Sequence, residues 1–538
     1  MGFSRLAANV PAAMLAALLA APTSAKTLVY CSEGSPEGFT PALYTSGTTF
    51  DATSRQIFNR LVEFKRGTVD PVPGLAASWD ISADGLTYTF HLRHGVKFHT
   101  TPWFTPTRDF DADDVLFSFN RQWKPEDPWH SVSHSNFSYF NSMALPQLLK
   151  SISKADDYTV VFTLNRPEAP FISELGMDFA SIQSAEFADK MMKAGTPEKF
   201  DHFPVGTGPF VFVNYQPDSV IRYAANPDYW NGRPKIDNLV FAITPDPSVR
   251  FAKLKANECQ IIALPNPADL PAMKADPNLK VLSGPALNIG YWAFNTEKKP
   301  FDDARVRRAM AMAIDKKAIL QSVYLGTGVN AVNLIPPNLW SYNSAVKDYP
   351  YDPAQAKKLL ADAGYPNGFS TDIWAMPVQR PYNPNAKRMA ESIQADLAKI
   401  GVTARIVTYE WGEYLKRVQE GDHQTVLLGW SADIGDPDNF FYVLLSCEAA
   451  KAGSTTRWCN KDYDDLVTRA KQLTTREQRT PLYEQAQVIM KQESPLVTIA
   501  HSVVSVPMRK DVVGFQLSPL GSPHYFDQVD LLPASEKK

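Results

Sequence analysis

Residues 374–441 constrain the fold of this chain more than any other stretch, because strand and helix patterns alternate in and around them in a regular order. Within the first helical part, Met389, Ile393 and Leu397 recur at spacings of four and so share one helix face. The predicted elements are a strand over 369–376, a helix over 386–400, a strand over 402–409, a helix from 411 to about 421 and a strand over 425–430. This βαβαβ order is typical of α/β folds with parallel strands and right-handed crossovers.

Two loops of opposite charge leave the strands of this unit. Arg380 lies in the segment 377–384, whose three prolines exclude both helix and strand, and Asp433 follows the last strand. The carboxyl ends of parallel strands meet at one sheet edge, which is where open α/β sheets bind ligands. We therefore expect the ligand site between a guanidinium and a carboxylate at this edge.

Length and charge limit the partners. A chain of 538 residues is too long for a single hydrophobic core and predicts two or three domains. Charged residues make up 21% of the chain, the formal net charge is -3, and there is no long run of one sign. These values argue against nucleic acid or an anionic membrane surface as partner and favour a small neutral or zwitterionic one.

Residues 1–25 have the pattern of a cleaved export signal. Arg5 supplies the positive start, 6–21 are rich in Ala and Leu, and small residues precede a cleavage site after Ala25. The mature chain is then expected to start at Lys26. No other stretch approaches 18 apolar residues, so we expect an exported product that is not embedded in a membrane.

Export allows the four cysteines to form two disulfides, with three possible connectivities. Cys447 and Cys459 lie close in sequence, and pairing them leaves Cys31 with Cys259. The second link would join the mature N-terminus to a segment more than 200 residues away, which predicts a discontinuous domain. Metal ligation by these cysteines is disfavoured, because no CxxC pair is present.

The N-terminal part of the mature chain also contains recognisable elements. Residues 45–49, which include Gly47 and Thr48, are small and polar, and we interpret them as a loop whose backbone can approach a ligand. The further predicted elements are a strand over 27–30, a helix over 51–61, a hairpin over 74–99 and a helix over 112–121 capped by Asp111.

Histidines of the hairpin offer a possible metal cluster, but the pattern does not favour one. His91 and His94 point to opposite faces of a strand, so they cannot readily share an ion with His99. We predict no metal site and no cofactor. No HExxH, GxSxG or glycine-rich phosphate loop is present, so nothing indicates an enzyme.

Several segments together resemble one known family. They are 79–99, Pro204 to Phe210, Asn226 to Trp230 and Phe301 to Ala309, and they resemble signature segments of the family 5 extracellular solute-binding proteins of ABC importers. The stretches 374–385, 408–414 and 435–441 are similar to the dipeptide-binding members in particular. The four cysteines also match the positions of the two disulfides there. The resemblance covers the whole mature chain.

The resemblance implies an α/β, two-lobed periplasmic binding protein fold with three domains and the ligand in the interlobe cleft. Domain I would comprise 26–58, 209–286 and 505–538, domain II 59–208, and domain III 287–504. The expected link between Cys31 and Cys259 would fall within domain I.

The resemblance also implies roles for the two charged loops. Asp433 matches the carboxylate that takes the α-ammonium of a peptide, and Arg380 the arginine that takes its α-carboxylate. Physical chemistry points the same way, because a buried dipeptide zwitterion requires an opposite charge at each end. Tyr382, Trp411 and Trp430 are weaker candidates for the pocket wall, since ordinary core packing explains a single aromatic of this kind better.

The expected function is therefore a periplasmic, monomeric dipeptide receptor that delivers its ligand to an inner-membrane ABC permease and is not an enzyme. Other cargo within the same family stays open, namely longer peptides, haem or 5-aminolevulinate. A secreted peptide hydrolase and a protein-binding holdase are the alternatives from other classes.

Overall fold

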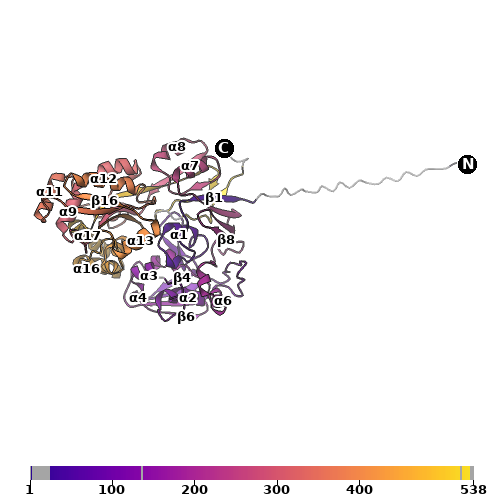
Figure 1. The fold of residues 1–538 in the computed structure, drawn as a ribbon. Helices are drawn as coiled ribbons and strands as arrows, with labels where there is room; N and C mark the ends of the chain where they lie inside the picture. The colour runs from indigo at the N-terminus through magenta and orange to yellow at the C-terminus, as the bar shows by residue number, and fades with distance from the viewer. Residues whose placement is uncertain (1, 3–24, 135–136, 521–523, 534–538) are drawn as a thin grey trace.

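The computed structural model describes residues 2, 25–134, 137–520 and 524–533. Nearly all of the predicted export signal, residues 1 and 3–24, lies outside the described residues. Within those ranges, no helix combines the length and the apolar character that a membrane span requires. Figure 1 shows the described chain, with the β4–β6 region and the helices α9, α11 and α12 in different parts of the molecule.

The predicted βαβαβ unit is present. Its elements are β15 (Ser370–Trp374), α12 (Ala386–Ala398), β16 (Thr403–Val407), α13 (Trp411–Glu420) and β17 (Thr425–Ser431). Trp374 pairs in parallel with Val407 on one side and with Val426 on the other, so β15 lies between β16 and β17. Both strands that precede the two charged loops therefore end at the same sheet edge, as predicted.

These strands belong to a larger mixed sheet that runs through the molecule. Its order is β16-β15-β17-β13-β18-β11-β1-β10-β9-β8, with β12 and β14 also paired to β18. The additional strands are β13 (Asn288–Phe294), β18 (Leu496–Arg509), β11 (Ile261–Ile262), β1 (Thr27–Ser32), β10 (Asn238–Ile243), β9 (Val220–Ala225), β8 (Phe210–Gln216), β12 (Leu279–Pro285) and β14 (Gly328–Asn330).

Strand β18 connects the two halves of this sheet. Its first part, from Leu496 to Ala500, pairs with β13, and its later part, from Val503 to Arg509, pairs with β12. The expected boundary between domains III and I, at residue 505, falls inside this strand. We propose that the chain crosses between these domains along β18.

A second sheet contains the predicted hairpin. Its order is β4-β5-β7-β6, from β4 (Ala76–Ile81), β5 (Thr87–Leu92), β7 (Thr159–Leu164) and β6 (Leu149–Asp156). The β4–β5 turn places Gly85 at a φ of 69°, a left-handed conformation that glycine adopts without strain. Helix α2 (Ala112–Trp123) begins at Asp111, which forms a capping box with Asp114 as its partner.

The prediction of a helix over 51–61 was wrong. Helix α1 spans Gly47–Ala52, so Gly47 and Thr48 form its first turn and are not part of a loop. Beyond it, the Ile57 carbonyl accepts a hydrogen bond from Gly208 N at 2.8 Å, which ties this segment to a distant part of the chain. Tertiary backbone pairing thus replaces the helix that the local pattern favoured.

Both predicted disulfides are formed. Cys31 on β1 joins Cys259 just before β11, with Cα atoms 5.8 Å apart. Cys447 joins Cys459, with Cα atoms 4.5 Å apart. The first bond links two neighbouring strands of the large sheet, because β1 pairs with β11 directly. It thereby joins two segments of the proposed domain I.

Candidate ligand-binding site

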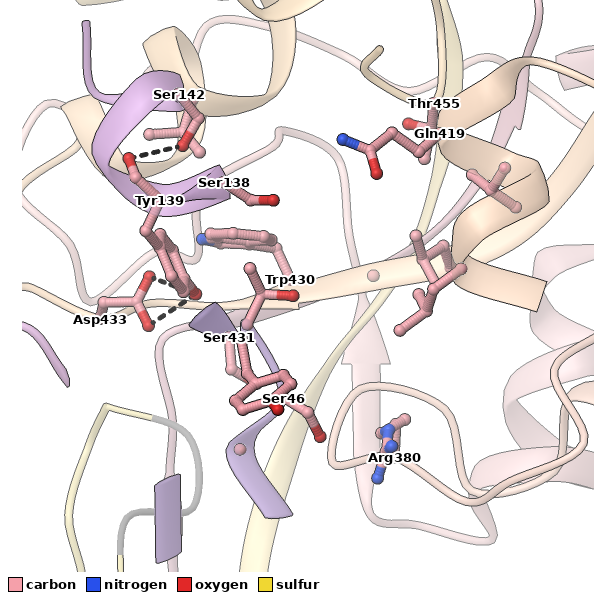
Figure 2. A pocket seen from close by; sticks show the side chains of 18 of the residues that line it. Ser46, Ser138, Tyr139, Ser142, Arg380, Gln419, Trp430, Ser431, Asp433 and Thr455 are labelled. Atoms are coloured by element: carbon pink, nitrogen blue, oxygen red, sulfur yellow. Dashed lines mark hydrogen bonds between the residues drawn. The ribbon is translucent and has the colours of Figure 1, made fainter. Parts of the chain in front are cut away.

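A cavity of about 660 Å³ lies where the three proposed domains meet. Its walls come from residues 33–55, from 138–142 and from several segments between 380 and 455. Every residue that the sequence predicted for the ligand site lines it: Gly47, Thr48, Arg380, Tyr382, Trp411, Trp430 and Asp433. Figure 2 shows Asp433 with Tyr139 and Trp430 on one side of this space and Arg380 well apart from them.

Asp433 follows β17 and carries its carboxylate among hydrogen-bond donors. The Tyr139 hydroxyl donates to the carboxylate, at 3.3 Å from each oxygen, and Asn439 Nδ2 donates to Oδ2 at 3.4 Å. The Asn439 side chain also accepts from the backbone N of Asp433 at 2.9 Å, which holds the loop. Withdrawal from water, together with the nearby Asp178 carboxylate, raises the pKa of Asp433 to about 7. A cationic ligand group would favour its charged form.

Arg380 sits on a tight turn, because its backbone N and O exchange hydrogen bonds with Asn383 at 3.1 and 3.0 Å. Its guanidinium carbon lies 4.5 Å from the ring centroid of Trp411. Atom Nη1 donates to Thr48 Oγ1 at 3.4 Å and is 3.8 Å from Glu33 Oε1. In the described chain, Nε and Nη2 have no hydrogen-bond partner, so one edge of the fork is open to a carboxylate.

The aromatic candidates line the cavity and pack in the core at once. Trp430 Nε1 donates to Asn439 Oδ1 at 3.1 Å, so Asn439 orients both Trp430 and Asp433. Tyr382 is buried, and a Cβ at Gly429 would lie 2.2 Å from its ring. Glycine at that position of β17 is therefore what lets the Tyr382 loop approach the strand.

Residues 45–49 contribute differently from the expectation. Thr48 reaches the site through its hydroxyl, which contacts both Arg380 and Glu33. Gly47 lines the cavity, but a Cβ there would meet nothing within 4 Å, so close approach by protein atoms does not require a glycine.

Two residues at the site were missed from the sequence. Tyr139, on the short helix α3 (Ser138–Ser142), reaches Asp433 across 294 residues of chain. Glu33 follows β1 directly and faces Arg380. Nothing in the local pattern of either residue marks it as a site residue. Only the strand order, which brings the end of β1 toward the cavity, could have indicated Glu33.

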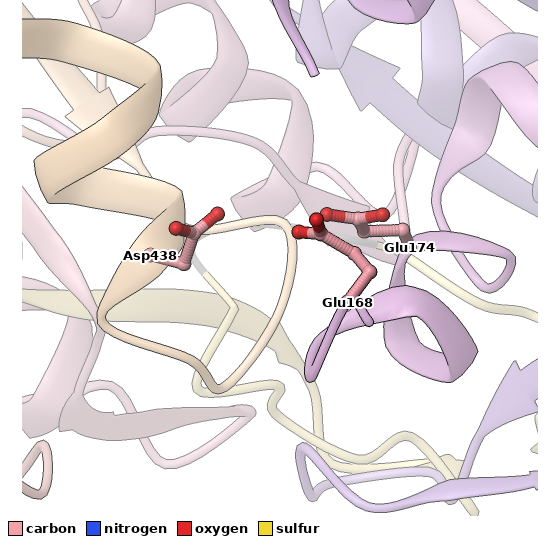
Figure 3. A group of neighbouring side chains, drawn as sticks. All are labelled: Glu168, Glu174 and Asp438. Atoms are coloured by element: carbon pink, nitrogen blue, oxygen red, sulfur yellow. The ribbon is translucent and has the colours of Figure 1, made fainter. Parts of the chain in front are cut away.

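One group of acids elsewhere has the spacing of a metal site among the described residues. It consists of Glu168, Glu174 and Asp438, whose carboxylates lie close together in Figure 3. Lys471 Nζ lies 2.8 Å from Glu168, 3.5 Å from Asp438 and 4.0 Å from Glu174. The Lys471 ammonium already supplies a positive charge among these three carboxyl groups. We call the four residues together the Lys471 cluster. None of its four residues lines the cavity.

Comparison with known proteins supports one family. Residues 70–452 match the model described as bacterial extracellular solute-binding proteins, family 5 Middle. The chain is 57% identical to a dipeptide-binding protein of Escherichia coli K12 over 519 residues, covering 96% of this chain and 97% of the relative. It is 54% identical to heme-binding protein A of Haemophilus influenzae over 499 residues, covering 93% and 91%.

Solved structures agree with this relationship. The crystal structure of a dipeptide-binding protein from Pseudoalteromonas sp. SM9913 in complex with Met-Leu superposes with a TM-score of 0.90 at 41% identity, covering 94% of this chain and 100% of that one. The fold is thus the two-lobed α/β fold of periplasmic binding proteins. The chain belongs to family 5 of the bacterial extracellular solute-binding proteins.

Proposed function

We propose that this protein is the periplasmic receptor of an ABC importer and that it binds dipeptides by both charged termini. Asp433 takes the α-ammonium and Arg380 the α-carboxylate, and the loaded receptor delivers the dipeptide to an inner-membrane permease. A receptor of this kind closes by a hinge motion, because the ligand contacts both lobes and favours the closed state. It acts as a monomer and performs no reaction on its ligand.

The observation that carries this proposal is the missing cation beside Asp433. Among the described residues, no lysine, arginine or histidine forms an ion pair with this carboxylate, although it is withdrawn from water. Leaving a charge unpaired in such a place costs several kcal/mol, and a ligand ammonium would remove that cost. The open edge of Arg380 offers the complementary group for a carboxylate.

The relatives support a peptide as the cargo and leave haem as a second candidate, because one close relative is a heme-binding protein. The two cargoes place different demands on the site. A dipeptide needs one cationic and one anionic partner at a fixed separation. Haem carries no ammonium for Asp433.

The test is a calorimetric titration of ligand-stripped protein with Ala, di-Ala and tri-Ala. An added residue moves the carboxylate by roughly 3.3 to 3.6 Å, which a charged hydrogen bond does not survive. We expect di-Ala to bind, tri-Ala to bind at least about tenfold more weakly and Ala not to bind measurably. Equal affinity for tri-, tetra- and penta-Ala would contradict the simultaneous binding of both ligand termini by Asp433 and Arg380. Saturable binding of haem with no response to di-Ala would move the protein to the second candidate.

A further inference from the structure

Two carboxyl groups, those of Glu33 and Glu37, line the cavity together with Arg380. Glu33 Oε1 accepts a hydrogen bond from the Thr48 hydroxyl and lies 3.8 Å from Arg380 Nη1. The Glu33 side chain is only 14% exposed and is therefore held in place. This carboxylate is built into the wall beside the guanidinium.

A second carboxylate, that of Glu37, lies on the same segment and lines the same cavity. Its backbone N donates to Thr49 Oγ1 at 3.0 Å, which fixes it against helix α1. Withdrawal from water raises the pKa of Glu37, while Arg380 lowers it and Glu410 raises it further. Two cavity-lining carboxyl groups, those of Glu33 and Glu37, thus lie near the Arg380 guanidinium.

We infer that Glu33 and Glu37 select dipeptides whose second residue has a cationic side chain. This inference rests on the proposed function, because it uses Arg380 as the partner of the ligand's α-carboxylate. That contact places the second residue at the Arg380 end, and its side chain then enters the field of Glu33 and Glu37. A lysine or arginine side chain is attracted there, and a glutamate or aspartate side chain is repelled.

One cationic side chain of the wall has to be separated from this effect. Lys416, on helix α13, is exposed and also lines the cavity. It would favour an acidic ligand side chain. A Lys416→Gln variant therefore serves as the matched control, because it removes one wall charge of the opposite sign.

The experiment titrates ligand-stripped protein with Ala-Lys, Ala-Gln and Ala-Glu, and with Lys-Ala and Glu-Ala as positional controls. We expect Ala-Lys to bind roughly five- to thirtyfold more tightly than Ala-Glu. The ratio is modest because water and salt partly screen the charges of the cavity wall. The ratio for Lys-Ala over Glu-Ala should be smaller, since the first side chain lies away from this end. The Glu37→Gln variant should lower the Ala-Lys to Ala-Glu ratio, and the Glu33→Gln/Glu37→Gln variant should bring it close to one. The Lys416→Gln variant should raise it.

Two results would overturn the selection: a ratio near one in the parent protein, or a ratio that the Glu33→Gln/Glu37→Gln variant leaves unchanged. Ala-Gln binding reports that each variant is folded and holds a neutral dipeptide. If Ala-Gln binds normally without a charge preference, only this inference fails. If no dipeptide binds to the parent protein, the proposed function fails.

Discussion

Asp433 and Asp438 lie on one short segment, yet they stand in different electrostatic settings. Burial raises the pKa of each carboxyl group to about 7. Asp438 has the ammonium of Lys471 3.5 Å away, within the Lys471 cluster. Asp433 has hydroxyl and amide donors, and the described chain brings no cation into ion-pair contact with it.

The difference separates a structural charge, that of Asp438, from a proposed binding charge, that of Asp433. The Lys471 cluster joins Glu168 and Glu174 of the proposed domain II to helices α14 (Asp438–Leu445) and α16 (Lys461–Gln472) of domain III. Its cation is part of the chain and is only 3% exposed, so no ligand is needed. Under the proposed function, the cation that pairs with Asp433 is the ligand's α-ammonium. The same segment would then provide both a fixed link and a receptor group.

The largest effect should come from removing the internal cation. Lys471→Met leaves three buried carboxyl groups without it, which should lower the free energy of unfolding by roughly 3–5 kcal/mol at pH 8. Burial already raises the pKa values of Glu168, Glu174 and Asp438, so these groups take up protons as the pH falls. The loss should therefore be smaller at pH 5 than at pH 8, measured by chemical denaturation.

Lys461→Met is the matched control, because this lysine is on the same helix and is 87% exposed. It should change stability by less than about 0.5 kcal/mol. If Lys471→Met and Lys461→Met change the free energy of unfolding by the same amount, the Lys471 cluster is not a structural link. The contrast between Asp438 and Asp433 would then fail.

A smaller effect is expected on the pH dependence of ligand binding. Because the pKa of Asp433 is about 7 in the unliganded protein, the carboxyl group is neutral below that pH and must lose its proton to pair with an ammonium. Affinity for di-Ala should fall about tenfold per pH unit below pH 7. Titration calorimetry between pH 5 and 8 measures this slope. The Asp433→Asn variant should lack it, and a flat profile in the parent protein would contradict the assignment.

The smallest effect concerns the stability of the unliganded protein. The folded-state pKa of Asp433 is about 7, above the ordinary value of 3.8, so the folded state holds the proton more tightly than the unfolded state. Stability contributed by this group is present below about pH 4 and is lost as the pH rises through 7. Asp433→Asn should be more stable than the parent by about 1–2 kcal/mol at pH 8 and about equally stable at pH 4. The gain at pH 8 is smaller than the full pKa shift implies, because the Asp433 side chain is partly exposed to water. A variant less stable at pH 8 would contradict the unpaired charge.

Local patterns were sufficient for much of the fold and for the two charged loops that line the cavity. The proline-rich loop around Arg380 and the strand before Asp433 could be read directly, since both depend on residues close in sequence. The helix predicted over 51–61 failed because Gly208, which pairs with Ile57, is about 150 residues away. Tyr139 and Glu33 were missed for a related reason: each reaches the site only through tertiary packing, and neither lies in a motif.

The central claim is that Asp433 binds the ligand's α-ammonium. Its most direct test is a thermodynamic cycle that combines one change in the ligand with one change in the protein and measures the binding affinity of each combination. Di-Ala and N-acetyl-di-Ala are titrated into the parent protein and into Asp433→Asn. Acetylation removes the ligand cation, so on the parent it should cost about two to four decades of affinity, from roughly 3–5 kcal/mol for a broken buried pair. On Asp433→Asn it should cost less than about tenfold, because the pair is already broken. The same cost on both proteins would show that the ammonium binds elsewhere.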